Sequence, residues 1–174
     1  FSFPNRNRLF LLYSMIQAFT ETGFNPDICT EDNRIDTSVA STQIRFLVKF
    51  INDLDGSIAY AYPQLTNGIK PRFTSMTFGY NINPDFYIGS TKLLPAGHWK
   101  YEVYEVSWIG TVVVALNTAP ATETDILPVA DTNGVVQGIV TKGILNLTER
   151  AGTEQVQYTQ HPEPSGKNTI YYGQ

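Results

Sequence analysis

The sequence predicts an all-β protein, and three observations lead to this fold class. Val, Ile, Thr, Phe, Tyr and Trp make up 67 of the 174 residues, and these side chains are enriched in strands because they suit a pleated, half-buried surface. From residue 44 onward, apolar and polar residues alternate in short runs. Turn-forming residues interrupt these runs about every 8 to 12 residues, which is the strand spacing of a sandwich or barrel.

Composition also excludes several classes of protein. The formal net charge is −4 and 16% of the residues are charged, so no basic patch for nucleic acid is expected. The single cysteine, Cys29, cannot form an internal disulfide and has no neighbouring Cys or His for a structural zinc. We therefore expect a compact, sparsely charged domain without cofactor or metal.

Residues 1–43 are expected to form an N-terminal arm, either a short amphipathic helix or an extended segment, followed by a linker. The apolar residues at helical spacing would share one face of that helix. These residues are Leu9, Leu12, Ile16 and Phe19. Residues 25–43 are polar and weakly periodic, which is typical of a linker.

A secretory signal is the alternative interpretation of the chain's start. Arg6 and Arg8 precede an apolar run, as in a signal sequence. The residues after the run, 20–22, form a poor cleavage site. The apolar run is also shorter than the ~20 residues of a membrane span. The structural arm is therefore the favoured reading.

The main domain is assigned to residues 44–160 and opens with a hairpin. Ile44 to Ile51 alternate in polarity, and alternation resumes from Ser57 to Tyr62. Asp55-Gly56 between the two runs is a strong hairpin signal, because Gly supplies a positive φ without steric cost. Pro63 should end the second strand or place it at an edge, since proline has no amide hydrogen.

Further strands are predicted along the rest of the domain. A third strand spans residues 72–80, with Phe86, Ile88 and Leu93 continuing the sheet, and the most strongly patterned strand spans 98–108. Residues 111–116 are almost continuously apolar, which suits a strand buried on both faces. A loop is expected at 117–134, and more strands at 135–147 and 154–160.

One motif refines the fold class. The segment that contains Leu93, Pro95, Gly97 and Trp99 resembles the Leu-x-Pro-Gly-x-x-Tyr corner of immunoglobulin-like and fibronectin-like sandwiches, with Ala96 where Gly is usual. Trp99 replaces the usual tyrosine, and its indole N–H could donate the equivalent hydrogen bond to the corner backbone. The resemblance implies an antiparallel Greek-key, Ig-like β-sandwich.

Candidate chemical groups are few. His98 is expected to be exposed on its strand, and Asp53 and Asp55 to be ordinary turn residues rather than calcium ligands. Glu102 and Glu105 have opposite strand parity and should point to opposite faces, so they do not form an acid/base pair. No nucleophile and base can be nominated together, and the sequence therefore favours a non-enzymatic protein.

The C-terminal residues 161–174 form either a tail or a last strand of the domain. Large apolar side chains in residues 155–174 are candidate interface residues, because aromatic side chains are enriched at interfaces. They are Tyr158, Ile170, Tyr171 and Tyr172. The tail could add a strand to the sheet edge of a neighbour, or it could pack on its own domain.

Several sequence segments resemble segments of small virion structural proteins of tailed bacteriophages. They are residues 46–54, 59–63, 100–108, 157–160 and 170–173. The resemblance implies a non-enzymatic role in the virion, with major capsid or portal/connector subunits as partners and with copies of the same chain as neighbours in a homo-oligomer. It does not distinguish a minor capsid or decoration protein from a head–tail connector component. A carbohydrate-binding or adhesive module is the alternative, and neither sequence-specific nucleic acid binding nor membrane binding is expected.

Overall fold

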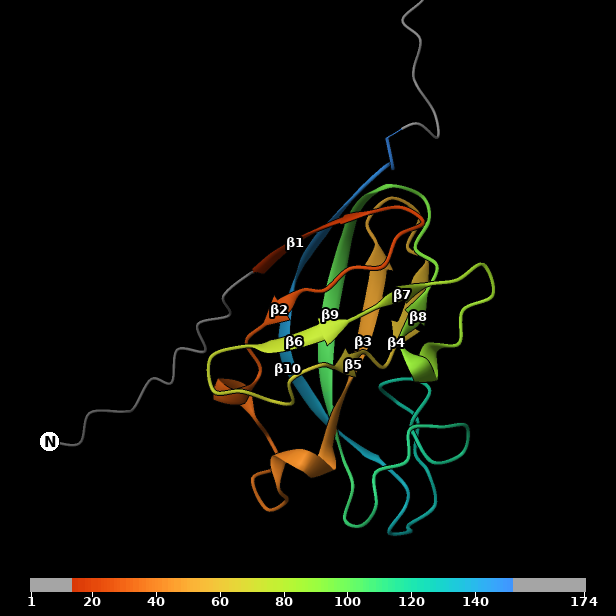
Figure 1. Ribbon diagram of the computed structural model, residues 1–174. Coiled ribbons are helices and arrows are strands. Elements are labelled where there is room, and N and C mark those ends of the chain that lie inside the picture. Colours follow the sequence, from red (N-terminus) through yellow and green to blue (C-terminus); the bar gives the residue numbers. More distant parts are fainter. Residues whose placement is uncertain (1–13, 152–174) are drawn as a thin grey trace, which may run out of the picture.

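The computed structural model describes residues 14–151, and this part of the chain is mostly β-strand (Figure 1). The strands are β1 (Ser14–Phe19), β2 (Asp27–Ile28), β3 (Ile44–Asn52), β4 (Ile58–Ala61), β5 (Gln64–Leu65), β6 (Thr74–Thr77), β7 (Gly79–Tyr80), β8 (Ser90–Thr91), β9 (Gly97–Ser107) and β10 (Val135–Thr148). Three short 3-10 helices are η1 (Glu31–Asn33), η2 (Ser41–Gln43) and η3 (Phe86–Ile88). The all-β prediction is confirmed.

The strands form a main sheet with the order β1-β10-β9-β3-β4 and a small sheet with the order β2-β6-β5. Within the main sheet, β3 pairs antiparallel with both β4 and β9, and β9 pairs antiparallel with β10. β1 is the exception, because it runs parallel to β10 at the sheet edge. β7 and β8 form a separate parallel pair.

The main core lies between the two sheets. Period-two alternation places Phe46, Val48 and Phe50 on the inner face of β3, where they pack with Met76 and Phe78 from the other layer. Phe50 meets Phe78 edge-on with 5.4 Å between ring centroids. In Figure 1 the β6 strand runs across the strands of the main sheet, so these side chains bridge the two layers.

The predicted hairpin is confirmed. β3 and β4 pair antiparallel from Val48–Ala61 to Ile51–Ile58, and Gly56 between them has a φ of 72°. β4 ends at Ala61, two residues before Pro63, which agrees with the expectation that a proline without an amide hydrogen ends this strand.

The corner before β9 has the hydrogen bond that the sequence predicts. The Trp99 indole N–H donates to the carbonyl oxygen of Pro95 at 3.1 Å, and Leu93 is buried beside the core. Here the chain leaves the β7–β8 pair and enters the main sheet.

Of the two alternatives for the N-terminal arm, the helix is wrong for the residues that the structure describes, because Ser14–Phe19 is the extended strand β1. Ile16 and Ala18 are buried in the core, whereas Met15 and Phe19 are exposed on the other face. The apolar residues of this run fit the two-residue period of a strand as well as the spacing of a helix. The strand forms because the edge of β10 offers hydrogen-bond partners to its backbone. Leu9 and Leu12 lie outside the described residues.

Two further predictions are wrong. Residues 111–116 form no strand and belong to the connection between β9 and β10, where Val112 and Val114 pack on the outer face of the main sheet. β3 and β10 occupy both edges of β9, so this run cannot pair beside the strand that precedes it. Phe86 and Ile88 lie in η3, because the Asp85 carboxylate accepts the backbone N–H of Tyr87 and starts a 3-10 turn.

Candidate functional site

Two long connections meet at one end of the domain. The β2–β3 loop (residues 29–43) and the β9–β10 loop (residues 108–134) both arise where Ile44, Ser107 and Val135 lie side by side in register. The β3–β4 hairpin and the corner lie at the opposite end (Figure 1). We call the end with the two loops the loop end.

The β9–β10 loop is long but well fastened at its base. Trp108 is fully buried, and its indole N–H donates to the carbonyl oxygen of Thr132 at 3.1 Å. Backbone hydrogen bonds join Gly110 to Asp131 and Gly134 to Thr118. A Cβ on Gly134 would lie 2.6 Å from the Trp108 ring, so only glycine allows this close approach. The base of the loop is therefore held by the buried Trp108 ring and by the backbone hydrogen bonds around it.

Glu123 fastens the middle of the loop to the main sheet. Its carboxylate forms an ion pair with the ammonium of Lys49 and accepts the hydroxyl of Tyr60 at 2.6 Å. Burial alone would raise the pKa of Glu123, but the hydrogen bonds from Lys49 and Tyr60 outweigh burial, so this pKa lies below its ordinary value. Burial and the bond to Glu123 raise the pKa of the Tyr60 phenol.

A buried glutamate fastens the other loop. Glu105 is 0% exposed on the inner face of β9, and its two carboxylate oxygens accept the backbone N–H groups of Ile35 and Asp36 at 3.0 and 2.7 Å. Backbone donors thus compensate for the burial of this carboxylate. The β2–β3 loop gains a fixed attachment to the sheet at its centre.

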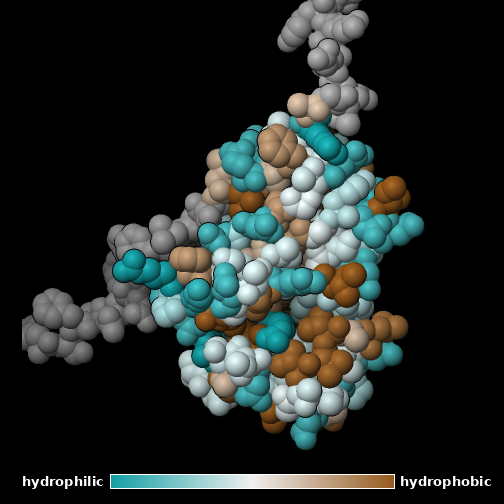
Figure 2. All heavy atoms as spheres, in the orientation of Figure 1, coloured by the Kyte–Doolittle hydropathy of each residue, from teal (hydrophilic) through white to brown (hydrophobic). Residues whose placement is uncertain are grey.

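The β9–β10 loop presents apolar side chains to solvent although its base is fastened. Ile126 is 92% exposed and Val129 is 102% exposed, and Ile109 and Leu116 are also exposed. Figure 2 shows hydrophobic residues gathered over η3 and this loop. Single exposed apolar residues are ordinary, but such a group on one fastened loop is typical of an interaction surface.

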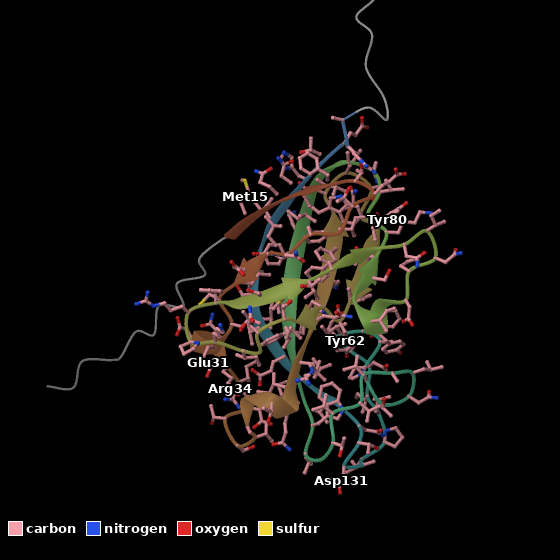
Figure 3. The ribbon with its side chains drawn as sticks, in the orientation of Figure 1. Met15, Glu31, Arg34, Tyr62, Tyr80 and Asp131 are labelled. Atoms are coloured by element: carbon pink, nitrogen blue, oxygen red, sulfur yellow. The ribbon has the colours of Figure 1, made fainter. Side chains whose placement is uncertain are left out.

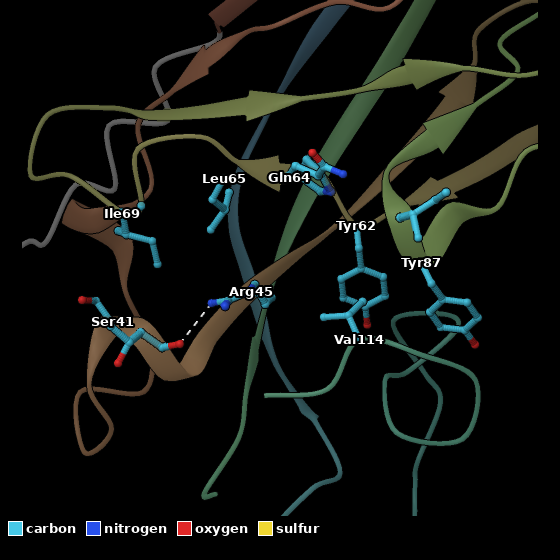
Figure 4. Close-up of a pocket in the computed structure, with 12 residues that line it drawn as sticks. Ser41, Arg45, Tyr62, Gln64, Leu65, Ile69, Tyr87 and Val114 are labelled. Atoms are coloured by element: carbon cyan, nitrogen blue, oxygen red, sulfur yellow. Dashed lines mark hydrogen bonds between the residues drawn. The ribbon is translucent and has the colours of Figure 1, made fainter. Parts of the chain in front are cut away.

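A groove of about 650 Å³ lies beside this loop (Figure 4). The β2–β3 loop, the start of β3, the segment after β4, η3 and Val114 supply its lining, which consists of Ser41, Thr42, Arg45, Tyr62, Pro63, Gln64, Leu65, Gly68, Ile69, Tyr87, Ile88 and Val114. Tyr62 is almost fully buried, donates its hydroxyl to the carbonyl oxygen of Pro120 at 2.6 Å, and stacks with Tyr87. Tyr87 therefore offers the more accessible ring of this pair.

Arg45 lies on the floor of the groove and is half-buried. Its Nη1 donates to the carbonyl oxygens of Thr42 at 3.1 Å and Ile44 at 2.6 Å. These bonds hold the guanidinium at the junction between η2 and β3. Burial lowers the pKa of this group, although an arginine stays protonated at any physiological pH.

Most of the charged residues considered in the sequence analysis form hydrogen bonds or ion pairs within the fold. Asp53 pairs with Lys100 at 2.7 Å, and Asp55 accepts the backbone N–H of Ser57 at 2.9 Å. His98 is exposed on β9. Glu102 and Glu105 point to opposite faces, as predicted, and Glu102 accepts the Tyr104 hydroxyl. Within residues 14–151, no group of three His, Cys, Asp or Glu side chains could hold a metal ion.

Cys29 is half-buried near the carboxylate of Asp32, with 3.5 Å between Sγ and Oδ2. Burial and the neighbouring Asp32 raise the pKa of its thiol. A raised pKa disfavours the thiolate, which is the reactive form. This environment agrees with the sequence, which nominates no partner base for Cys29.

The candidate interface residues fall into three groups, which are buried, exposed, or outside the part of the chain that the structure describes. Ile16 is buried in the core and unavailable to a partner, because strand alternation turns it inward, whereas Phe19 is 56% exposed. Tyr158, Ile170, Tyr171 and Tyr172 lie outside the described residues.

Sequence reasoning missed Arg45, Glu123 and the exposed tips of the β9–β10 loop. The length of the segment between the last two strands was an available signal, because loops longer than about 12 to 15 residues are usually functional or disordered. The apolar run at 111–116 concealed this signal, since it was interpreted as a strand.

Comparisons with known proteins give no identification. No family model matches the chain, and neither the curated proteins nor the solved structures contain a match. No helix within residues 14–151 has the length and apolar character needed to cross a membrane.

Proposed function

We propose that the chain is a non-enzymatic structural protein of a bacteriophage virion, which docks on neighbouring capsid or head–tail connector subunits through its loop end and its termini. The observation that carries this proposal is the group of exposed apolar side chains on the fastened β9–β10 loop, with Ile126 and Val129 almost fully exposed. A rigid apolar surface suits stable protein contacts, because little conformational entropy is lost on docking. The virion itself is proposed on the sequence resemblance.

We also propose that the fold is an Ig-like Greek-key sandwich of the variable type. The order β2-β6-β5 agrees with strands B, E and D of such a domain, and β10-β9-β3-β4 agrees with strands G, F, C and C′. In this assignment the corner with Trp99 precedes strand F, and the β2–β3 and β9–β10 loops take the places of the B–C and F–G loops. Variable domains carry binding loops at these places, which supports a binding role for the loop end.

The test is incorporation into particles. Replacing Ile126 and Val129 together by Asp adds charge to two solvent-exposed side chains, so the fold should be retained while docking is lost. Leu54→Asp is the matched control, because Leu54 is 85% exposed in the hairpin at the opposite end. We expect the wild-type chain and the control to copurify with assembled particles in a fixed ratio to the major capsid subunit, and the double variant to be absent.

Equal incorporation of the double variant would rule out the loop end as the docking surface. Failure of the wild-type chain to copurify would rule out the virion role. The termini need their own variants, namely removal of residues 1–13 or 161–174. A longer N-terminal deletion is unsuitable, because β1 contributes Ile16 and Ala18 to the core.

A carbohydrate-binding module is the alternative function. Such a module presents open aromatic faces, whereas the Tyr62 ring is buried and the Tyr60 and Tyr104 hydroxyls are bound to glutamates. Within the described residues, Tyr87 is the ring of the groove best placed to stack on a sugar. A glycan array that gives a signal lost in Tyr87→Ala would favour this alternative.

A further inference from the structure

The groove beside the β9–β10 loop carries one positive charge and no negative charge in its lining. Of the twelve residues that line it, Arg45 alone is charged (Figure 4). The other polar side chains are hydroxyls and one amide, and the remainder are apolar or small. An anionic group flanked by apolar atoms is therefore the complementary ligand.

The guanidinium of Arg45 has hydrogen-bonding capacity left over. Nη1 is occupied by the carbonyl oxygens of Thr42 and Ile44. The Nε–H and the two Nη2–H groups have no acceptor among residues 14–151. A carboxylate could accept Nε–H and Nη2–H together, which is the strong bidentate geometry of arginine.

The groove does not offer a strand edge to its ligand. The start of β3 extends beyond the end of β4, but Ile44 is 0% exposed and Phe46 is 3% exposed, so their backbone groups are covered. A ligand segment with few amide hydrogens therefore suits this groove better than an added strand. Proline-containing segments have this property, and they dock in grooves lined by aromatic rings.

We propose that this groove receives Glu163 of a second copy of the chain, with Pro162 and Pro164 packed against its apolar walls. The sequence between residues 152 and 174 contains only Glu154, Glu163 and Lys167 as charged residues, and Glu163 alone stands between two prolines. Glu163 is twelve residues beyond Ala151, a reach of up to about 40 Å in extended chain. The inference rests on the proposed assembly function and names the partner of one of its surfaces.

Charge reversal in the full chain tests the docking. Arg45→Glu places two glutamates in contact, and Glu163→Arg places two arginines in contact, so each variant alone should self-associate about tenfold or more weakly than wild type. An equimolar mixture pairs each groove with a tail of opposite charge, and association should return. Sedimentation over a range of concentrations measures each case.

Other outcomes would overturn the inference. Wild-type chain that stays monomeric at every concentration, single variants that associate like wild type, or a mixture that does not recover would each do so. Competition by micromolar N-acetylglutamate would identify a small carboxylate as the ligand instead of Glu163.

Two controls complete the design. Thermal unfolding of each variant checks the fold, since Arg45 also binds two backbone carbonyls. Glu163→Gln changes no residue of the two sheets and should still weaken association. If removal of residues 161–174 prevents particle incorporation but Glu163→Gln leaves association unchanged, the assembly function stands and this docking does not.

Discussion

The two ends of the domain are held by different kinds of contact. At the hairpin end, Asn52 accepts the backbone N–H groups of Leu54 and Asp55, and Trp99 donates to Pro95, so these side-chain hydrogen bonds span at most four residues. The exposed Asp53–Lys100 ion pair is a longer-range side-chain contact at this end. At the loop end, Glu105 binds residues about seventy positions away, and Lys49 reaches Glu123 across seventy-four positions (Figure 3 shows the side chains of both ends). The turn and the corner at the first end are thus shaped mainly by short-range hydrogen bonds, whereas the loops at the second end are attached by buried contacts between residues far apart in the sequence.

This difference bears on function. A turn whose hydrogen bonds lie within the turn itself tolerates few substitutions, because most of them would remove a bond that holds the turn. A loop attached to the sheet at a few points can expose the side chains between those points, as Ile126 and Val129 do. Binding residues are commonly found on loops that a rigid scaffold positions. The comparison therefore predicts that the fastening glutamates at the loop end matter most for stability.

The largest effect is expected at Glu105. Glu105→Gln keeps the side-chain shape but replaces one acceptor oxygen with a donor that faces a backbone N–H. We expect the free energy of unfolding to fall by about 2 kcal/mol, because a buried donor loses its charged partner. Denaturant unfolding measures the loss. Glu102→Gln on the opposite face is the control, since Glu102 is half-buried and accepts a hydroxyl.

Equal losses in the Glu105 and Glu102 variants would contradict a special role for Glu105. Hydrogen exchange at the amides of Ile35 and Asp36 gives a second measurement. These amides should exchange faster in Glu105→Gln, while the amides of the hairpin turn should not change.

A smaller, pH-dependent effect is expected at Glu123. Glu123→Gln should lower the free energy of unfolding by about 1 kcal/mol at pH 7, because the half-buried ion pair with Lys49 is lost. The pKa of Glu123 is lowered in the folded state, so its contribution is present above the unfolded pKa of about 4.3 and is lost as the pH falls through the folded pKa. Unfolding curves of both proteins should converge at acidic pH. A difference that stays constant down to pH 2 would exclude titration of Glu123 as its source.

An effect no larger than that at Glu123, and independent of pH, is expected at the hairpin. Gly56 has a φ of 72°, and nothing lies within 4 Å of an added Cβ, so Gly56→Ala should cost only the left-handed backbone strain of about 1 kcal/mol. Gly79→Ala is the matched control, since Gly79 is equally unobstructed and does not have a positive φ. A shift in melting temperature for Gly56→Ala but not for Gly79→Ala is the expected result. Equal shifts would rule out the left-handed backbone of Gly56 as the source of the effect.

The fold class and the hairpin could be predicted because their signals are local. Alternation over Ile44–Ile51, the Asp-Gly turn and the corner with Trp99 each depend on neighbours within a few residues, and the structure contains all three. The candidate site could not be predicted in the same way. Arg45 looks like an ordinary outward residue of a strand, and nothing near it in sequence reveals the groove formed by Ile69, Tyr87 and Val114.

The sequence by itself determined that this protein is all-β, where its hairpin and corner lie, and that its glutamates on β9 face opposite ways. Only the tertiary structure decided that the N-terminal run is an edge strand and that the apolar run after β9 is a loop on the outer face. The physical reason is that period and turn chemistry act along the chain. Whether an apolar segment becomes helix, strand or packed loop depends instead on which sheet edge or face is free when the chain folds.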